Sequence, residues 1–228
     1  MRVLTCLALC LMNIAGSAAD QAQFVSSSVV EAWSPKDGTR IDFEVLRQGD
    51  PFGRHSLQFE RGDNGRLSVS TDVELSVKFG FVTVYKYTLR SEEVWQDNAL
   101  VSVTGITNKN GDRFTMQARK DGNAMLVEGT GFSGSVPVPV IPSSHWNRLQ
   151  VYRDQMLSTE SGELLDIDVE RLGRDTIIVA GEALETTHYR LKSDLNVDLW
   201  YDDQSRWVKL LFNARGQQIE YVLTSLYE

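Results

Sequence analysis

The chain has 228 residues, of which 42% are hydrophobic and 24% are charged, as in folded globular proteins. This composition excludes a disordered chain, a collagen-like chain and a membrane protein with several spans. The formal net charge of -8 argues against nucleic acid as a partner, because phosphate contacts require a basic surface.

Residues 1–19 have the three-part design of a secretory signal peptide. Arg2 is followed by an apolar run at 3–11 and then by small residues that end at Ala19. This run is too short for a transmembrane helix, which needs about 20 apolar residues. We therefore predict cleavage after the signal peptide 1–19. The mature chain, 20–228, would be a single β-rich domain without a transmembrane segment, located in the periplasm or secreted.

Both cysteines of the chain, Cys6 and Cys10, lie within this leader. A lipoprotein site needs a small residue before its cysteine, whereas Leu9 precedes Cys10. We therefore expect a soluble exported protein that has no disulfide, no cysteine nucleophile and no cysteine-bound metal.

Alternation of apolar and polar residues dominates the predicted mature chain. It is clearest at 67–78 and again at 81–90, with Gly80 marking a turn or kink between the two runs. Such alternation is typical of an antiparallel strand with one buried and one solvated face. The predicted buried face of the first run consists of Leu67, Val69, Val73, Leu75 and Val77.

Similar runs recur along the chain and are separated by turn sequences such as Lys36-Asp37-Gly38 and Asn108-Lys109-Asn110-Gly111. Short strands at this spacing predict an all-β, mainly antiparallel fold, as a sandwich, a barrel or a strongly curved sheet. The other expected strands are 40–47, 54–60, 100–107, 113–119, 124–130, 164–172, 175–180, 185–192, 197–201, 207–212 and 217–226.

Two adjacent segments interrupt this pattern. Segment 135–142 contains three of the five prolines, which cannot donate a hydrogen bond inside a central strand, so we interpret it as a Pro-rich connector. The next segment begins with serines that can cap a helix, and it places Trp146 and Leu149 at helical spacing. We predict one short helix at about 143–153, between two β halves of the domain.

Several motifs, taken together and in order, resemble a family of uncharacterised exported bacterial proteins. They are DGTRIDFEV from Asp37, FGRHSLQF from Phe52, EVWQDNAL from Glu93, TNKNG from Thr107, PSSHWN from Pro142, WYDDQSRWVKLLF from Trp200 and IEYVL from Ile219. The resemblance covers nearly all of the predicted mature chain. The family is in turn similar to a wider group of curved antiparallel half-barrels, which includes the periplasmic lipoprotein carriers and an enzyme of the violacein pathway.

The resemblance implies a strongly curved open sheet or half-barrel of about a dozen strands with one short helix. It also implies a concave apolar face, which relatives use for hydrophobic ligands. It implies no catalytic residues, because the family has no assigned chemistry and a fold alone does not give function.

The three histidines, His55, His145 and His188, are candidates for metal binding or proton transfer. No two of them have a spacing that presents them together on one strand or helix. We therefore interpret them as surface or hydrogen-bonding histidines, and we predict no metal site and no cofactor.

Neighbouring carboxylates and serines also give no catalytic pattern. Glu92 and Glu93 would point to opposite faces of a strand, so they cannot act as a pair. Asp202 and Asp203 fall in a predicted hairpin turn, where aspartate commonly binds the backbone. Segment 131–134 is one residue short of a nucleophile elbow and does not lie between a strand and a helix.

Aromatic residues are the remaining candidates for a site. They would line a hydrophobic pocket if the sheet curls around a cavity, and they would fill the core if it does not. In the last hairpin, Val208, Leu210 and Phe212 share one face, as do Ile219, Tyr221 and Leu223, and we expect these to point inward. The candidate lining residues of a pocket are Tyr85, Tyr87, Trp95, Trp146, Phe212 and Tyr221.

The leading functional prediction is that the protein binds or carries a hydrophobic or amphipathic ligand, such as a lipid or another small molecule, on the concave face. One alternative is an enzyme with a half-barrel pocket and no standard catalytic motif. The other is a structural or interaction protein of the cell envelope. The presence of a pocket on the concave face, and the polarity of its lining, distinguish these three hypotheses.

Overall fold

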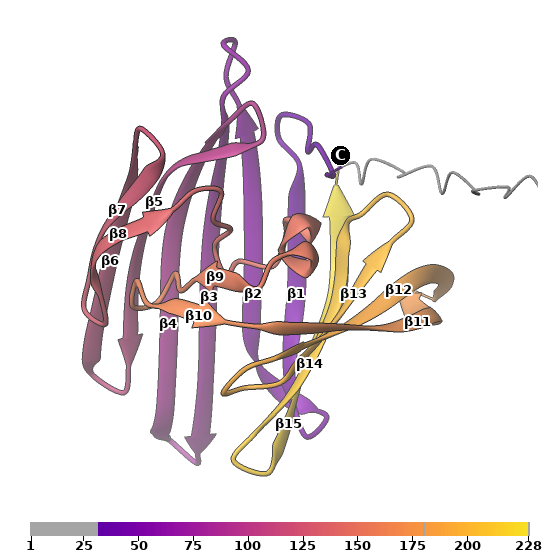
Figure 1. Ribbon diagram of the computed structural model, residues 1–228. Helices are drawn as coiled ribbons and strands as arrows, with labels where there is room; N and C mark the ends of the chain where they lie inside the picture. The colour runs from indigo at the N-terminus through magenta and orange to yellow at the C-terminus, as the bar shows by residue number, and fades with distance from the viewer. Residues whose placement is uncertain (1–31, 180, 228) are drawn as a thin grey trace, which may run out of the picture.

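The computed structural model describes residues 32–179 and 181–227, so the predicted signal peptide and its cleavage site lie outside the described residues. These residues form fifteen strands and one 3-10 helix (Figure 1). The strands before the helix are β1 (Arg40–Arg47), β2 (Asp50–Arg61), β3 (Leu67–Phe79), β4 (Val82–Gln96), β5 (Ala99–Lys109), β6 (Asp112–Asp121), β7 (Ala124–Gly129) and β8 (Ser133–Pro137).

The helix η1 (Arg148–Tyr152) is followed by two short strands, β9 (Gln155–Leu157) and β10 (Leu164–Asp166). The last five strands are β11 (Asp168–Val179), β12 (Glu182–Lys192), β13 (Val197–Asp202), β14 (Trp207–Ala214) and β15 (Gln217–Tyr227). Thirteen strands form one antiparallel sheet in the order β11-β12-β13-β14-β15-β1-β2-β3-β4-β5-β6-β7-β8, and β9 pairs with β10.

Two meanders, β1 to β8 and β11 to β15, build this sheet, and the pairing of β15 with β1 joins them. At this junction Val45 lies opposite Tyr221. Because β8 and β11 are the two free edges and do not pair with each other, the sheet curves but stays open (Figure 1). The predicted all-β half-barrel is therefore confirmed, and the sandwich and the closed barrel are not formed.

The chain between β8 and β11 must pass from one edge of the sheet to the other. It does so across the concave side, where residues 138–167 form a segment that we call the strap (Figure 1). Proline-containing β8 lies at the edge, where a missing N–H leaves no gap in a central ladder.

The helix in the strap is shorter than the one predicted at about 143–153. The 3-10 helix begins at Arg148, and Asn147 caps it by accepting a hydrogen bond from the Leu149 N–H at 3.0 Å. The preceding residues cannot join this helix, because the Ser143 N–H is bonded to Leu157 O and His145 has a left-handed φ of 65°. The serines of this segment therefore do not cap the helix.

The hydrophobic core lies between the concave face of the sheet and the strap. Most of the predicted inner-face residues are buried, among them Leu67, Val69, Leu210, Ile219 and Leu223. Val77 and Phe212 are only partly buried. The strap contributes its own buried core residues, among them Ile141, Trp146, Val151, Met156 and Leu157. The strap is thus an integral layer of the fold.

Two glycines of the sheet let the strap approach its backbone closely. A Cβ atom on Gly105 of β5 would lie 2.0 Å from Thr159 O, and one on Gly129 of β7 would lie 2.3 Å from Ser161 O. Both contacts are with backbone atoms, which cannot rotate away as a side chain can. Any larger residue at either position would have to push the strap off the sheet.

We predict that Gly105→Ala and Gly129→Ala each lower the free energy of unfolding by about 1–3 kcal/mol, the usual cost of overpacking a core. Gly62→Ala is the matched control, because its closest contact would be the flexible Asn64 side chain at 3.2 Å. Urea denaturation of the three variants checks this. Equal stability of Gly105→Ala and Gly62→Ala would show that the strap does not press on the sheet.

Candidate functional site

A pocket of about 290 Å³ lies between the strap and the concave face of the sheet. Its lining is mixed, because imidazole, phenol, hydroxyl and carboxylate groups stand beside two aliphatic side chains. The sheet contributes His55, Thr71, Val73, Tyr87, Leu89 and Tyr221, and the strap contributes Ser143, Ser144, His145, Ser158, Thr159, Glu160, Ser161 and Glu163.

Both histidines of the pocket pack on Trp207 of β14, which is fully buried. The ring centroid of Trp207 is 5.3 Å from that of His55 and 5.7 Å from that of His145, both at steep angles. Phe43 and Tyr221 complete this aromatic cluster, at 4.3 and 6.1 Å from Trp207. Edge-to-face packing of this kind holds the two imidazoles in fixed orientations.

Gln150 of η1 determines which ring nitrogen of His145 carries the proton. Its side-chain nitrogen donates to the His145 carbonyl at 3.2 Å and also to the hydroxyl of Tyr201. Its oxygen therefore faces His145 Nδ1, at 3.1 Å, and must accept a hydrogen bond from it. Nε2 of His145 is left as the acceptor nitrogen. Burial lowers the pKa of His145 to about 4.

His55 of β2 has no hydrogen-bond partner for either ring nitrogen among the described residues, although it is only 6% exposed. Burial, and secondarily the nearby His145, lower its pKa to about 3, so the ring is neutral at pH 7. The Thr71 hydroxyl, also buried in the lining, has no partner either. Unpaired buried groups of this kind cost about 1–3 kcal/mol each.

The opposite wall of the pocket carries an acidic group. The Tyr87 hydroxyl donates to Glu160 Oε2 at 3.0 Å, and Lys109 Nζ lies 3.6 Å from Glu160 Oε1. Burial is the main cause that holds the pKa of Tyr87 well above its usual value, and the negative charge of Glu160 adds to this rise. Burial likewise raises the pKa of Tyr221. The phenols and imidazoles of the pocket are thus all uncharged at pH 7.

A buried carboxylate fastens the strap to the sheet beside this pocket. Oε2 of Glu93, on β4, accepts hydrogen bonds from the indole N–H groups of Trp95 at 2.8 Å and Trp146 at 2.9 Å. Glu93 is fully buried, and burial raises its pKa, an effect that the two indole N–H donors counteract. Since Trp146 belongs to the strap, this contact fixes one end of the pocket.

A family model described as a domain of unknown function, DUF6134, matches residues 43–224. The chain belongs to the DUF6134 family. This confirms the predicted membership of a family without assigned chemistry. No curated protein is significantly similar to the chain.

Among solved structures, this DUF6134 protein is similar to a β-barrel-like protein of another domain of unknown function, DUF1849, from Brucella abortus. The identity is 7%, the TM-score is 0.60, and the match covers 84% of this chain and 98% of that one. LprF from Mycobacterium bovis is 12% identical over 83% of this chain and 85% of its own, with a TM-score of 0.32. The first likeness supports the fold alone.

The six residues predicted to line a pocket occupy three places. Tyr87 and Tyr221 line the strap pocket, while Trp95 and Trp146 hold Glu93. The other two lie outside the pocket: Tyr85 packs on Phe52 at 5.9 Å and Phe212 packs on Tyr221 at 6.4 Å between ring centroids. That all six contact one ligand stays a prediction.

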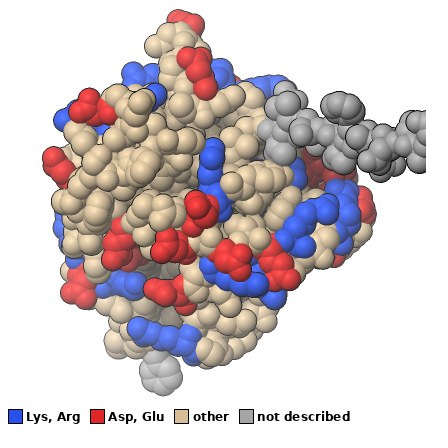
Figure 2. Space-filling view, viewed as in Figure 1, with Lys and Arg blue, Asp and Glu red and all other residues tan. Residues whose placement is uncertain are grey.

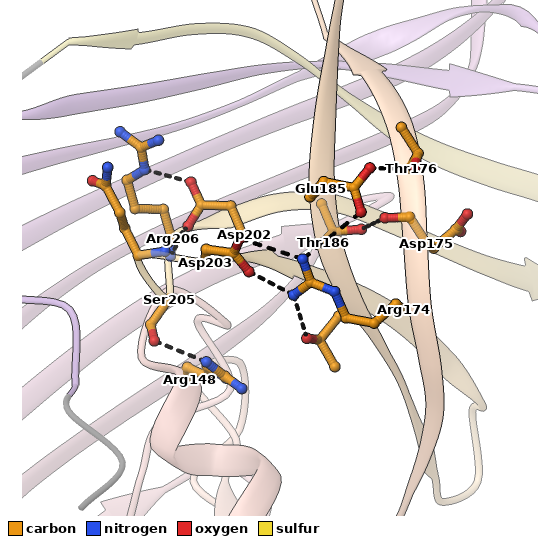
Figure 3. A network of polar contacts seen from close by, with 12 residues as sticks. Arg148, Arg174, Asp175, Thr176, Glu185, Thr186, Asp202, Asp203, Ser205 and Arg206 are labelled. Carbon is orange, nitrogen blue, oxygen red and sulfur yellow. Dashed lines mark hydrogen bonds and ion pairs between the residues drawn. The ribbon is translucent and has the colours of Figure 1, made fainter. Parts of the chain in front are cut away.

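A second polar network of the DUF6134 protein is structural (Figure 3). Arg174 of β11 binds Asp203 at 2.5 Å, and Arg148 of η1 donates to the Ser205 hydroxyl at 3.0 Å. Asp202 accepts from the backbone N–H groups of residues 204 and 206, as predicted for a hairpin turn. These contacts tie the β11–β12 hairpin and the helix to the turn between β13 and β14.

Charges on the strap side of the molecule are mixed, since Figure 2 shows acidic and basic side chains interspersed over the described part of this face. Among the described residues, no three histidine, aspartate or glutamate side chains converge to hold a metal ion. Nor does the described part of the chain contain a helix long and apolar enough to cross a bilayer.

We predict that the ring signals of His55 and His145 do not titrate between pH 8 and pH 5, because both pKa values are lowered, to about 3 and about 4. Carbon–proton NMR of the imidazole groups in the folded protein checks this. His55→Gln and His145→Gln assign the signals. A midpoint near pH 6.5 for either ring would contradict the burial of the neutral form.

Proposed function

We propose that this DUF6134 protein binds a small amphipathic molecule in the pocket beneath the strap. The observation that carries the proposal is His55, a buried imidazole in the lining whose two nitrogens have no partner among the described residues. Nearly all buried polar groups in proteins are hydrogen-bonded, so an unpaired one at a pocket wall calls for an occupant.

The lining indicates the polar groups that such a ligand needs. Nε2 of His145 accepts a hydrogen bond, so the ligand must offer a donor, such as a hydroxyl or an N–H group, to this atom. The neutral His55 ring and the Thr71 hydroxyl can each donate or accept. Val73 and Leu89, with the ring of Tyr221, supply the apolar side of the pocket.

The size of the pocket restricts the ligand further. Its volume of about 290 Å³ corresponds to roughly ten water molecules at ~30 Å³ each, near the lower end for ligand pockets. The strap cannot move aside easily, because Trp146 is bonded to Glu93 and residues 159 and 161 press on glycines of the sheet. This supports the amphipathic ligand of the sequence-based prediction over a bulky lipid.

The pKa values favour recognition over proton transfer. A general base works best when its pKa lies near the operating pH, whereas His145 and His55 have pKa values of about 4 and about 3. No serine hydroxyl of the described residues is hydrogen-bonded to either imidazole, so the arrangement of a nucleophile with its base is not formed. The imidazoles act as neutral hydrogen-bonding groups.

We predict that phenol and catechol, as small probes with a ring and a donor, shift the NMR signals of His55 and His145. His55→Phe keeps a ring but removes both hydrogen-bonding atoms, so we expect about tenfold weaker binding of catechol, for a loss of about 1.4 kcal/mol. Thr71→Val replaces the hydroxyl with a methyl group of nearly the same size, and it should weaken the binding of catechol by about threefold.

His188→Gln is the control, because His188 stacks on Trp200, and neither residue lines the pocket. This variant should bind both probes as the unmodified protein does. Palmitate serves as the lipid probe. One-to-one binding of palmitate, with no response of His55 or His145 to phenol or catechol at millimolar concentration, would overturn the proposal in favour of a lipid carrier.

We also propose, from the composition of residues 1–19, that the protein is exported and acts in the periplasm or outside the cell. We predict that the full-length chain, expressed in a Gram-negative host, is recovered from the periplasmic fraction or the medium. Its mass should correspond to a chain that begins at Asp20. Recovery of the uncleaved chain from the cytoplasm would contradict this.

A further inference from the structure

One hairpin of the sheet extends beyond its neighbours. The pairing of β3 with β2 ends at Leu75, and the pairing of β4 with β5 ends at Tyr87. Beyond these points β3 and β4 pair only with each other, with Val77 opposite Tyr85. We call residues 77–85 the tongue. It forms the lower end of the two long strands in Figure 1.

The end of the tongue is apolar and exposed. Phe81, in the turn, is fully exposed to solvent. Val82 and Val84 are 63% and 58% exposed. Three large apolar side chains therefore stand in solvent within four positions of the chain. Contiguous exposed apolar groups of this kind mark sites of interaction with a membrane or a partner.

Three cations without ion-pair partners among the described residues lie near the base of the tongue. Lys86 and Arg113 line one surface groove together, and Glu74, the acid of that groove, is bonded to Arg54 at 3.1 Å. Arg215 lies close enough to Tyr85 for its charge to oppose the rise that burial and the Glu160 charge cause in the pKa of that phenol. Among the described residues, Lys86, Arg113 and Arg215 form no ion pair.

We propose that the tongue docks the protein on an anionic lipid bilayer, with Phe81 and its two valine neighbours in the interfacial layer and the three cations at the phosphate groups. The tongue extends about 15 Å past the paired sheet, from a rise of about 3.4 Å per residue, so its tip can enter the headgroup region before the body of the protein meets it.

Charge complementarity selects a membrane as the occupant and also sets the orientation. The chain as a whole has a net charge of -8, so an anionic surface repels most of the molecule. The unpaired cations beside the tongue are attracted to that surface. One short apolar tip with a few cations gives weak, reversible docking. This proposal does not depend on the ligand pocket.

The test is flotation of the mature chain with two kinds of vesicle, one of phosphatidylcholine alone and one with about 30% phosphatidylglycerol. We expect binding to the anionic vesicles only, reduced by high salt. Phe81→Ser should lower the partition coefficient about tenfold, from the loss of one large apolar side chain. The double variant Lys86→Gln, Arg113→Gln should lower it at low salt and make it less dependent on salt.

Ile178→Ser is the matched control, because Ile178 is 66% exposed on another hairpin, β11–β12, far from the tongue in Figure 1. It should bind anionic vesicles as the unmodified protein does. Thermal melting should show all variants folded, since the changed side chains are exposed. Absence of vesicle binding, or equal binding by Phe81→Ser, would overturn the proposal. So would a dimer in light scattering that Phe81→Ser dissociates, without vesicle binding, because the tongue would then serve self-association.

Discussion

The connection between the two edges of the sheet constrains the rest of the structure. Because β8 and β11 are the two outer strands, the chain between them has to cross the sheet, and it crosses on the concave side. Its side chains, with Trp146 and Leu157 fully or almost fully buried, fill the concavity that an open half-barrel would offer to a ligand. The strap therefore occupies much of the concave side, and the pocket lined by His55 and His145 lies between it and the sheet.

The place of that pocket follows from a break in the apolar inner face. Thr71 of β3 lies opposite Ser91 of β4, and Ser91 lies opposite Gly105 of β5. This row of small residues runs across three adjacent strands, where aliphatic side chains otherwise point inward. The missing volume admits the backbone of the strap at Thr159 and leaves room beside it for the polar lining. The row thus lets the strap approach the sheet, and its Thr71 adds a hydrogen-bonding group to the pocket.

The fold was largely predictable from the sequence because each strand carries its own signal. The alternation at 67–78 gave β3 to within one residue, and Gly80 was correctly placed at a turn. The position of the strap depends on contacts far apart in the chain, as between Trp146 and Glu93, which local patterns do not contain. For that reason the predicted helix was too long: residues 143–147 are held by distant partners instead of by a helix.

The candidate site was less predictable than the fold, although the sequence contained part of the pattern that marks it. Thr71 interrupts an otherwise apolar face of β3, and Glu93 does the same on β4; both were readable as polar groups directed into the core. His55 occupies such a position on β2. What the sequence could not indicate is that His145, from a distant segment, lies beside His55 on the same tryptophan. The aromatic residues were the more conspicuous candidates, and most of them serve the core because large rings bury the most area.

Strand β4 relates the two proposed surfaces to each other. It follows directly on Phe81, at the tip of the tongue, and carries Tyr87 in the pocket and Glu93 under the strap, at intervals of six residues. At a rise of about 3.4 Å per residue, each interval measures about 20 Å. With Lys86 at the phosphate groups, a docked protein would therefore hold Tyr87 and its end of the pocket near the headgroups, and Glu93 about 20 Å farther from them.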